Sequence, residues 1–333
     1  MNQSTPATPR SEPDVDRSAP LNPSEIFPFP LDDFQLEAMD ALNQGHSVVV
    51  SAPTGSGKTL IGEYAIHRAL AHGQKVFYTT PLKALSNQKL RDFRDQFGAE
   101  NVGLMTGDLS VNREASIVVM TTEIFRNMLY AEADEHDDPL ADVEAVVLDE
   151  CHYMNDSQRG TVWEESIIHC PPTVQLVALS ATVANAGQLT DWIEKVHGPT
   201  TLVMSDHRPV PLQFSFCSAK GLHPLLNEAG TGLHPNCKVW RAPKGHKRKG
   251  RSQRPPQPEP PPISFVVAQM AERQMLPAIY FIFSRRGCDK AVRDLGVQCL
   301  VTQEEQARIK ERLTAYSQDN PEAVRDGIHA DAL

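Results

Sequence analysis

Short apolar runs alternate with longer amphipathic stretches between Ile26 and Phe216. Several runs are continuously apolar, as in Ala145-Val-Val-Leu148, which is typical of strands buried on both faces of a parallel sheet. Stretches such as Leu60–His72 and Leu189–Val196 have the pattern of helices. The predicted strands are Ser47–Ala52, Lys75–Thr79, Ile117–Thr121, Ala145–Asp149, Val174–Ser180, Thr201–Met204 and Leu212–Phe216. The alternation predicts an α/β domain with a doubly wound parallel sheet.

The segments outside this pattern differ in composition. Residues 1–24 are rich in Ser, Pro and charge, and predict a disordered tail because they bury too little apolar surface to offset the entropy of ordering. Residues 217–262 break the alternation and predict a linker or insertion. Within them, Lys238–Arg254 holds eight Lys or Arg and no Asp or Glu. This run either contacts nucleic-acid phosphates or is a solvated spacer, and both interpretations stay open. Beyond it we expect a helix at Ile263–Arg273 and a strand at Ala278–Phe283.

Composition narrows the class of protein. A length of 333 residues gives room for about two domains, and a net charge of -10 argues against a general nucleic-acid coat protein, since such proteins are usually basic. The six cysteines include no Cys-x-x-Cys pair, so neither a zinc site nor a disulfide framework is expected. No apolar run reaches the ~18 residues of a membrane span, and the N-terminus lacks the pattern of a signal peptide. These features predict a soluble, cytoplasmic protein without a membrane partner.

A phosphate-binding loop follows the first strand. Glycines in such a loop let backbone N–H groups surround phosphate oxygens, and the N-terminus of the next helix adds a positive dipole. Lys58 offers a charge to the phosphates, and Thr59 offers a hydroxyl to Mg²⁺. Ala52 takes the place of the first glycine in the usual pattern. The predicted ATP-binding loop is Ala52, Pro53, Thr54, Gly55, Ser56, Gly57, Lys58 and Thr59.

Two acidic residues end the strand Ala145–Asp149 and complement this loop. Asp149 lies where a carboxylate can hold Mg²⁺, directly or through water. Glu150 can orient and deprotonate the attacking water and lies close enough to share the metal. We therefore predict that Glu150, Lys58 and Asp149 are catalytic, with Thr59, Asp149 and Glu150 around Mg²⁺.

At this point the chain resembles the superfamily 2 helicases, with motifs in the family's order. Asp149-Glu150-Cys151-His152 is similar to a DExH box. Ser180-Ala181-Thr182 resembles the motif that couples hydrolysis to strand movement, and the resemblance implies a coupling role for these three residues and for His152. Three segments resemble the nucleic-acid motifs and imply RNA contacts. They are Pro81-Leu82-Lys83, Thr106-Gly107-Asp108 and Thr121 to Leu129, the last with Thr121, Thr122, Glu123 and Arg126.

The sequence around two of these motifs has a physical logic of its own. Thr80-Pro81 predicts a helix start with a capping hydroxyl and Pro in the first turn. Thr122 before Glu123 predicts a second start of this kind. Two helix N-termini at the ends of adjacent strands would bind a nucleic-acid backbone without reading its sequence.

The segment from Thr121 to Leu129, with Arg208-Pro-Val-Pro-Leu212, most resembles the superkiller-type and exosome-associated RNA helicases. That subgroup has bacterial and plastid members, so a plastid location is the alternative for a plant protein. Phe27 and Gln35 resemble the family's adenine-reading segment. Gln35 also lies three residues after Asp32, the spacing of a capping box, so adenine recognition and closure of that box are both open interpretations. Ser284 and Arg285, after the strand Ala278–Phe283, are similar to residues near nucleic acid in the second motor domain.

The resemblance covers about residues 25–333 and implies a RecA-like domain at 25–216 and the start of a second at 263–333. The later ATP-coupling motif and the Gly-Arg-x-Gly-Arg motif have no match. The latter supplies arginine fingers, worth about 10³–10⁵ in rate for related phosphoryl transfers. We therefore expect a C-terminally truncated helicase that uses ATP and Mg²⁺ on RNA and acts in an RNA-degradation or RNA-processing complex. The alternatives are a DNA-directed motor of the same superfamily and a non-motor module that binds ATP and RNA.

Overall fold

The computed structural model describes residues 20–130, 139–156, 159–240, 260–296 and 300–319. The chain divides into two compact units between Pro211 and Leu212, five residues before the predicted end of the first domain. The assignment of residues 263–333 to a second RecA-like domain stays a prediction. The residues 1–19 of the predicted tail, and the basic run from residue 241 on, lie outside the described part.

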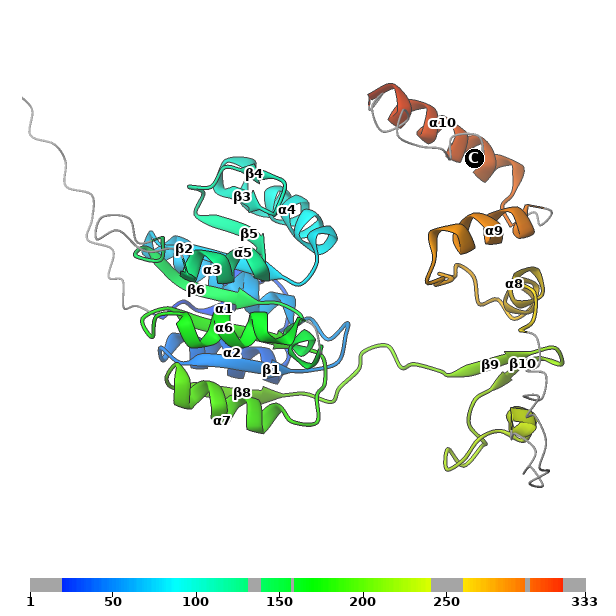
Figure 1. Ribbon diagram of the computed structural model, residues 1–333, viewed down its shortest axis with the longest axis horizontal. Coiled ribbons are helices and arrows are strands. Elements are labelled where there is room, and N and C mark those ends of the chain that lie inside the picture. Colours follow the sequence, from blue (N-terminus) through cyan, green and yellow to red (C-terminus); the bar gives the residue numbers. More distant parts are fainter. Residues whose placement is uncertain (1–19, 131–138, 157–158, 241–259, 297–299, 320–333) are drawn as a thin grey trace, which may run out of the picture. The chain divides into compact units, whose positions relative to one another are not determined.

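The first unit is built on an eight-stranded sheet of order β4-β3-β5-β2-β6-β7-β1-β8 (Figure 1). Every pairing in it is parallel except that of β4 with β3. The strands are β1 Ser47–Ser51, β2 Lys75–Thr80, β3 Val102–Met105, β4 Ser110–Val111, β5 Ile117–Thr121, β6 Val143–Leu148, β7 Gln175–Ser180 and β8 Thr200–Met204. All residues of β1 and β6 are buried, as their continuous apolar runs predict.

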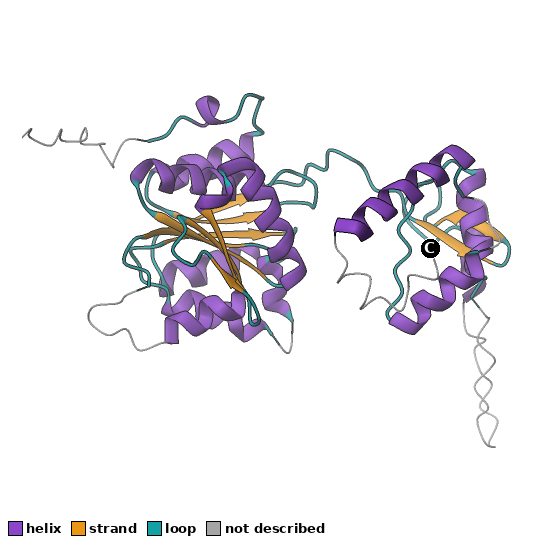
Figure 2. Ribbon diagram, turned by 90° about the horizontal axis from the view of Figure 1, so that it is seen from above, coloured by secondary structure: helices purple, strands orange, loops and turns teal. Residues whose placement is uncertain are grey.

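Helices cover both faces of this sheet (Figure 2). One core cluster joins the sheet to α2, α3 and α4 through residues such as Met39, Tyr64 and Phe93. The other joins it to α5, α6 and α7 through Phe125, Trp163 and Ile193. The helices are α1 Pro23–Ile26, α2 Asp33–Asn43, α3 Thr59–His72, α4 Lys83–Phe97, α5 Thr122–Tyr130, α6 Gly160–His169 and α7 Ala186–Val196, with 3₁₀ turns η1 Ala99–Asn101 and η2 Cys151–Asn155. The predicted doubly wound α/β class is confirmed, and the fold is RecA-like.

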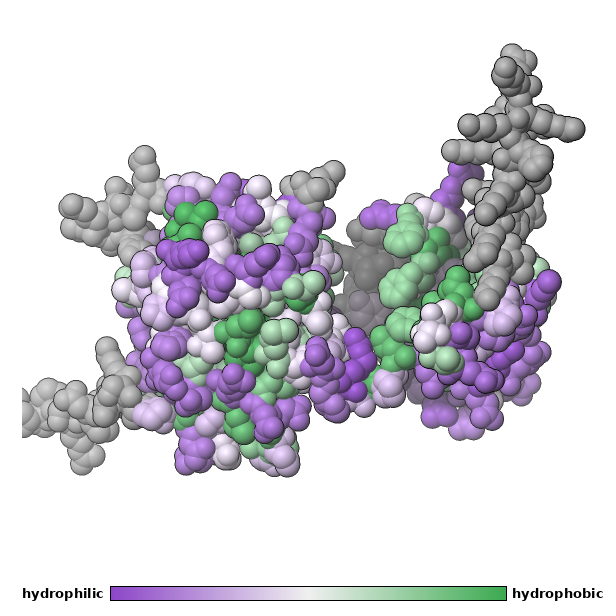
Figure 3. All heavy atoms as spheres, turned by 90° about the horizontal axis from the view of Figure 1, so that it is seen from below, coloured by the Kyte–Doolittle hydropathy of each residue, from purple (hydrophilic) through white to green (hydrophobic). Residues whose placement is uncertain are grey.

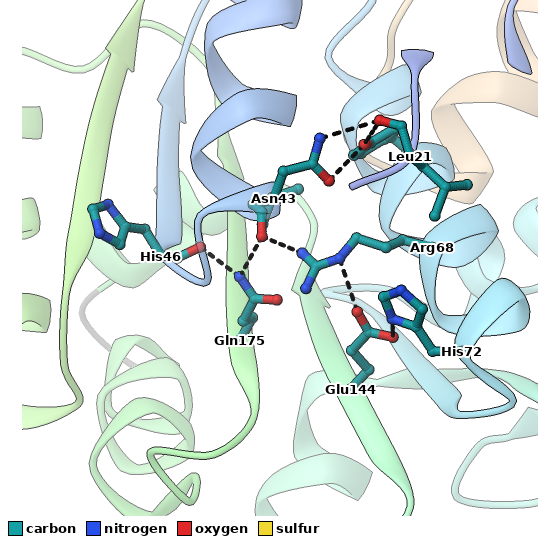
Figure 4. A network of polar contacts seen from close by, with 9 residues as sticks. Leu21, Asn43, His46, Arg68, His72, Glu144 and Gln175 are labelled. Carbon is teal, nitrogen blue, oxygen red and sulfur yellow. Dashed lines mark hydrogen bonds and ion pairs between the residues drawn. The ribbon is translucent and has the colours of Figure 1, made fainter. Parts of the chain in front are cut away.

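A polar network lies at the amino ends of β6 and β7 (Figure 4). Glu144 binds Arg68 Nε at 3.0 Å and His72 Nδ1 at 2.9 Å, and its side chain is only 8% exposed. Gln175 donates to the carbonyl oxygen of His46 at 2.8 Å. The carbonyl oxygen of Leu21 accepts from Tyr64. The network thus joins helices α2 and α3 to the sheet, and fixes the segment before α1.

The second unit is small and described by itself. It holds the antiparallel pair β9 Ser215–Ser218 and β10 Gly221–Pro224, then η3 Pro235–Trp240, α8 Ile263–Glu272, α9 Arg285–Leu295 and α10 Gln303–Asp319. Apolar side chains gather on its surface (Figure 3). None of the helices in the described residues has the length and apolar content that a membrane crossing needs.

Three expectations about elements were wrong. Leu212–Phe216 does not add a strand to the large sheet, because residues from Ser215 pair with β10 instead. Ala278–Phe283 forms no strand, since it pairs with none of the described segments and a strand needs a partner. Residues 20–24 of the predicted disordered tail are ordered, with α1 beginning at Pro23. The short strands β3 and β4 were not predicted.

Candidate nucleotide and nucleic-acid site

The predicted chemistry converges on one edge of the large sheet. Because β1, β2, β5, β6 and β7 are parallel, the loops that follow them all leave at the same edge. Ligands of open α/β sheets bind at this carboxyl edge. The phosphate-binding loop, the Asp149-Glu150 pair and the loops of the first unit proposed for RNA therefore leave the same edge of its sheet.

The phosphate-binding loop lies between β1 and α3. Gly55 and Gly57 both have φ of +84°, a left-handed conformation that favours glycine. Lys58 Nζ donates to the carbonyl oxygens of Ala52 at 2.7 Å and Pro53 at 2.9 Å. Burial lowers the pKa of Lys58, and the charges of Glu150 and Asp149 act in the opposite direction. Lys58 follows β1 and the two acidic residues follow β6, so all three lie at the carboxyl edge of the sheet.

Two observations test the fit of this loop to a phosphate. The hydroxyl of Ser56 is buried and has no hydrogen-bond partner, so it is available to a ligand oxygen. A Cβ at Gly57 would lie 2.6 Å from Gln35 Nε2, whereas a Cβ at Gly55 would meet nothing within 4 Å. Thr54 and Gly55 are exposed on the open side. The loop fits a phosphate chain.

Asp149 and Glu150 follow β6 directly. Asp149 accepts hydrogen bonds from the hydroxyl of Tyr78 at 2.8 Å and from the backbone N–H of Glu150 at 2.9 Å. Tyr78 is fully buried, and burial followed by the charge of Asp149 raises its pKa well above the usual value. Tyr78 therefore stays protonated and orients the Asp149 carboxylate. Glu150 has a φ of +53°, which lets the chain turn sharply into η2.

Oxygen ligands of the type that Mg²⁺ prefers lie at this site. They are the carboxylates of Asp149 and Glu150 and the hydroxyl of Thr59, which accepts a hydrogen bond from Lys89 Nζ at 3.4 Å. Mg²⁺ usually takes one or two carboxylates and completes its shell with substrate phosphates and water. The residues present therefore fit a Mg²⁺ ion held together with ATP.

Two of the four predicted coupling residues, His152 and Ala181, are in contact through the Nδ1 atom of His152. His152 Nδ1 lies 3.3 Å from Glu150 Oε2 and 3.4 Å from the backbone N of Ala181, at the end of β7. Nδ1 donates to the carboxylate when protonated and accepts from the amide when it is not, so it serves one partner at a time. Ser180 Oγ binds the carbonyl oxygen of Ala181 at 2.8 Å, and Thr182 is exposed beside it.

The side chain of Gln35 contacts both the start of α2 and the phosphate-binding loop. Its Oε1 accepts from the backbone N–H of Asp32 at 2.9 Å, which closes the capping box of α2. Its Nε2 donates to the carbonyl oxygen of Gly57 at 3.1 Å and so braces the phosphate loop. Phe27 is buried, with its ring edge-on to His67. Adenine recognition by Phe27 and Gln35 stays a prediction.

The predicted RNA-binding loops lie side by side after β2, β3 and β5. Lys83 forms an ion pair with Asp108, whose other oxygen accepts from Thr106 Oγ1 at 3.0 Å. A Cβ at Gly107 would meet nothing within 4 Å, so this loop is open at its tip. Leu82 is exposed, Pro81 is buried, and Thr121 is half-buried at the end of β5.

The helix starts at these loops differ from the prediction. α4 begins at Lys83 with Leu82 as its N-cap, two residues after the expected start. Thr80 does not cap it, because its hydroxyl lies 2.7 Å from Ser86 Oγ. The hydroxyl of Thr122 binds the carbonyl oxygen of Thr80 at 3.2 Å, so it joins two adjacent strand ends rather than capping α5.

The remaining RNA candidates are placed less favourably. Arg126 on α5 forms an ion pair with Glu165 at 3.5 Å. Ser284 caps α9 by accepting from the backbone N–H of Gly287 at 3.0 Å, and Arg285 follows it exposed. Both belong to the second unit.

Three residues of the site were missed by sequence reasoning. They are Tyr78, which binds Asp149, Lys89 beside Thr59, and Arg159, which contacts Pro81 and Glu123. No local pattern marks these pairs, since each partner is supplied by a distant segment. By contrast Cys151, to which no role was assigned, is buried, and burial raises the pKa of its thiol to about 12, which leaves it unreactive.

A phosphate loop after β1 and an Asp-Glu pair after β6 define a P-loop nucleoside-triphosphatase domain. The DEAD/DEAH box helicase family matches residues 32–189, which include both motifs. Residues 32–189 are therefore a DEAD/DEAH box helicase domain of superfamily 2.

Three curated relatives of the chain are named as helicases. It is 43% identical to the chloroplastic DExH-box ATP-dependent RNA helicase DExH15 of Arabidopsis thaliana, over 92% of this chain and 30% of the relative. It is 45% identical to "Probable helicase HelY" of Mycobacterium tuberculosis, over 86% and 33%. It is 40% identical to the exosome RNA helicase MTR4 of Mus musculus, over 88% and 29%. The chain thus spans about a third of the length of these relatives.

Proposed function

We propose that this chain supplies the ATP-hydrolysing domain of an ATP-dependent RNA helicase. The observation that carries the proposal is that the loop with Lys58 after β1 and the Asp149-Glu150 pair after β6 leave the same edge of the sheet, which also bears the loops around Lys83 and Thr122. One face would therefore bind ATP and RNA together.

In this proposal each residue has a separate task at the ATP. Lys58 and the backbone of residues 54–59 bind the phosphates, and Thr59 and Asp149 hold Mg²⁺. Bound Mg²⁺ neutralises charge on the phosphate oxygens. Glu150 orients the attacking water and accepts its proton. Tyr78 keeps the Asp149 carboxylate in place. Phe27 and Gln35 would recognise adenine.

RNA is the substrate that the relatives favour. Two of them are named RNA helicases, and this supports RNA over DNA for the loops after β2, β3 and β5. Those loops present Lys83 and the N-termini of α4 and α5, which suit a sugar–phosphate backbone. We further propose that Arg126, and Ser284 and Arg285 of the second unit, contact RNA.

Partner and location are proposed from the same relatives. One relative is named as an exosome RNA helicase, which supports membership of an RNA-degradation or RNA-processing complex. Another is named chloroplastic, which supports a plastid as the alternative to the cytoplasm.

ATP hydrolysis by the purified chain, with and without single-stranded RNA or DNA of equal length, tests the function. We expect RNA to stimulate hydrolysis, and Glu150→Gln to lower turnover by about 10²–10⁴-fold without preventing nucleotide binding, because the base is lost and the phosphate loop is kept. Stimulation by DNA alone would favour the DNA-directed motor. Binding of ATP and RNA without turnover would favour the non-motor module.

A further inference from the structure

The turn after the DExH box is fastened to the start of α6. A Cβ at Gly160 would lie 2.2 Å from the carbonyl oxygen of Met154, so only glycine allows the backbone of η2 to approach α6 this closely. The backbone N–H of Gly160 donates to the carbonyl oxygen of Asp156 at 2.9 Å, and that of Arg159 donates to Asp156 Oδ1 at 3.0 Å. A displacement of η2 would therefore carry Arg159 with it.

The side chain of Arg159 contacts the loops that follow β2 and β5. Its Nη2 donates to the carbonyl oxygen of Pro81 at 2.9 Å and forms an ion pair with Glu123. Pro81 follows β2, and Glu123 lies in the first turn of α5 after β5. A single guanidinium thus joins the loop after the DExH box to the two loops proposed to bind RNA.

We propose that Arg159 is a positioning residue that couples the nucleotide site to the RNA-binding loops within the first unit. The inference rests on the proposed function, because it requires that the loops at Pro81 and Glu123 bind RNA. A guanidinium suits this role because Nη2 alone carries two N–H donors, one for the carbonyl oxygen of Pro81 and one for the carboxylate of Glu123.

A purely stabilising role would predict a different outcome. The side chains of Arg159 and Glu123 are 39% and 32% exposed, and ion pairs at such positions contribute little to folding stability. Removal of Arg159 should leave the midpoint of thermal unfolding nearly unchanged. Its effect should fall on the link between nucleotide and RNA, which a stabilising ion pair would not influence.

The test measures the affinity for a labelled single-stranded oligouridine RNA, with and without a non-hydrolysable ATP analogue and Mg²⁺. For the wild-type protein we expect the analogue to change RNA affinity. Arg159→Ala should bring the ratio of the RNA affinities with and without the analogue closer to 1, by roughly 3- to 30-fold. Arg159→Lys keeps the charge on a shorter side chain without the planar group and should be intermediate. Arg113→Ala, at an exposed arginine just before β5, removes the same charge and should match the wild type.

The outcomes separate this inference from the function on which it rests. Absence of RNA binding by the wild type would overturn both. RNA binding by the wild type with no effect of the analogue would overturn the coupling, as would an equal ratio in Arg159→Ala and the wild type. If Arg159→Ala does not fold, the ratio in Arg159→Lys decides, and a wild-type value there overturns the inference.

Discussion

Two buried tyrosines place their hydroxyls at opposite edges of the sheet. The hydroxyl of Tyr78 donates to Asp149 at the carboxyl edge, while that of Tyr64 lies 2.7 Å from the carbonyl oxygen of Leu21 at the other edge. Each loses one hydroxyl on substitution by Phe, yet only Tyr78 contacts a residue of the ATP site. Comparing the Phe variants of the two tyrosines therefore distinguishes the loss of a buried hydrogen bond from the loss of orientation of the Asp149 carboxylate.

We expect Tyr78→Phe to raise the Mg²⁺ concentration for half-maximal ATP hydrolysis by about 10-fold, because partners that orient a metal ligand typically influence affinity to this extent. Tyr64→Phe should lower the free energy of unfolding by about 1 kcal/mol and leave the Mg²⁺ dependence unchanged. Titration of activity with Mg²⁺ for both variants is the measurement. Equal Mg²⁺ dependence in both would contradict the role given to Tyr78.

At the scale of single residues, the site residues that belong to a recognisable local sequence pattern could be predicted. Glycines, a lysine and a threonine in a fixed order identify the phosphate loop, and an Asp-Glu pair after an apolar run identifies its partner. Tyr78 was not predictable, because its contact with Asp149 spans 71 residues and depends on β2 lying beside β6. Gln35 was predicted with two possible roles, and the capping box of these is confirmed.

At the scale of the elements, Glu144 of β6 holds α3 to the sheet through its contacts with Arg68 and His72. Glu144→Ala would leave Arg68 and His72 without their shared acceptor in a setting where all three side chains are at most 14% exposed. We expect the free energy of unfolding to fall by about 3 kcal/mol, since breaking one partner of a buried pair strands the other charge. Thermal or urea unfolding measures this.

Glu114, which pairs with the first residue of β2, offers a matched control for Glu144. Glu114 pairs with Lys75 at 3.2 Å but is 88% exposed, so Glu114→Ala should cost less than about 1 kcal/mol. Nucleotide affinity should be unchanged in both variants, because neither residue lies at the carboxyl edge. Similar losses of stability in both would contradict the role of the Glu144 network.

The central elements were predictable and the peripheral ones were not. Continuous apolar runs identified the buried strands β1 and β6. The edge strand β4 has two exposed residues and leaves no such pattern. Ala278–Phe283 has the pattern of a strand without the structure, because hydrogen bonding to a neighbour cannot be read from one segment. α4 begins late since Thr80 uses its hydroxyl on Ser86.

At the scale of the whole molecule, the segment 278–283 exposes apolar side chains at alternate positions. Ile279, Phe281 and Phe283 are 82%, 79% and 105% exposed. An apolar surface of this kind promotes association. We expect apparent mass to rise with protein concentration, and replacement of the three residues by Ser to reduce the rise, as measured by light scattering. The same replacement at Val210, Leu212 and Phe214, also exposed at alternate positions, is the comparison. An effect confined to the latter set would contradict the prediction.

The place of β1 in the sheet has a consequence for synthesis of the protein. β1 carries the phosphate loop and lies between β7 and β8. The N–H of Leu176 that binds Ser47 Oγ is 129 residues further along, and Thr201, which contacts His46, is 155 residues further. At about 5–20 residues per second, a ribosome needs about 6 to 30 seconds to make that length. Val48, Val49 and Val50 must wait that long for their neighbours in the sheet. Of the eight strands of this sheet, β1 is made first and is among the last to be enclosed.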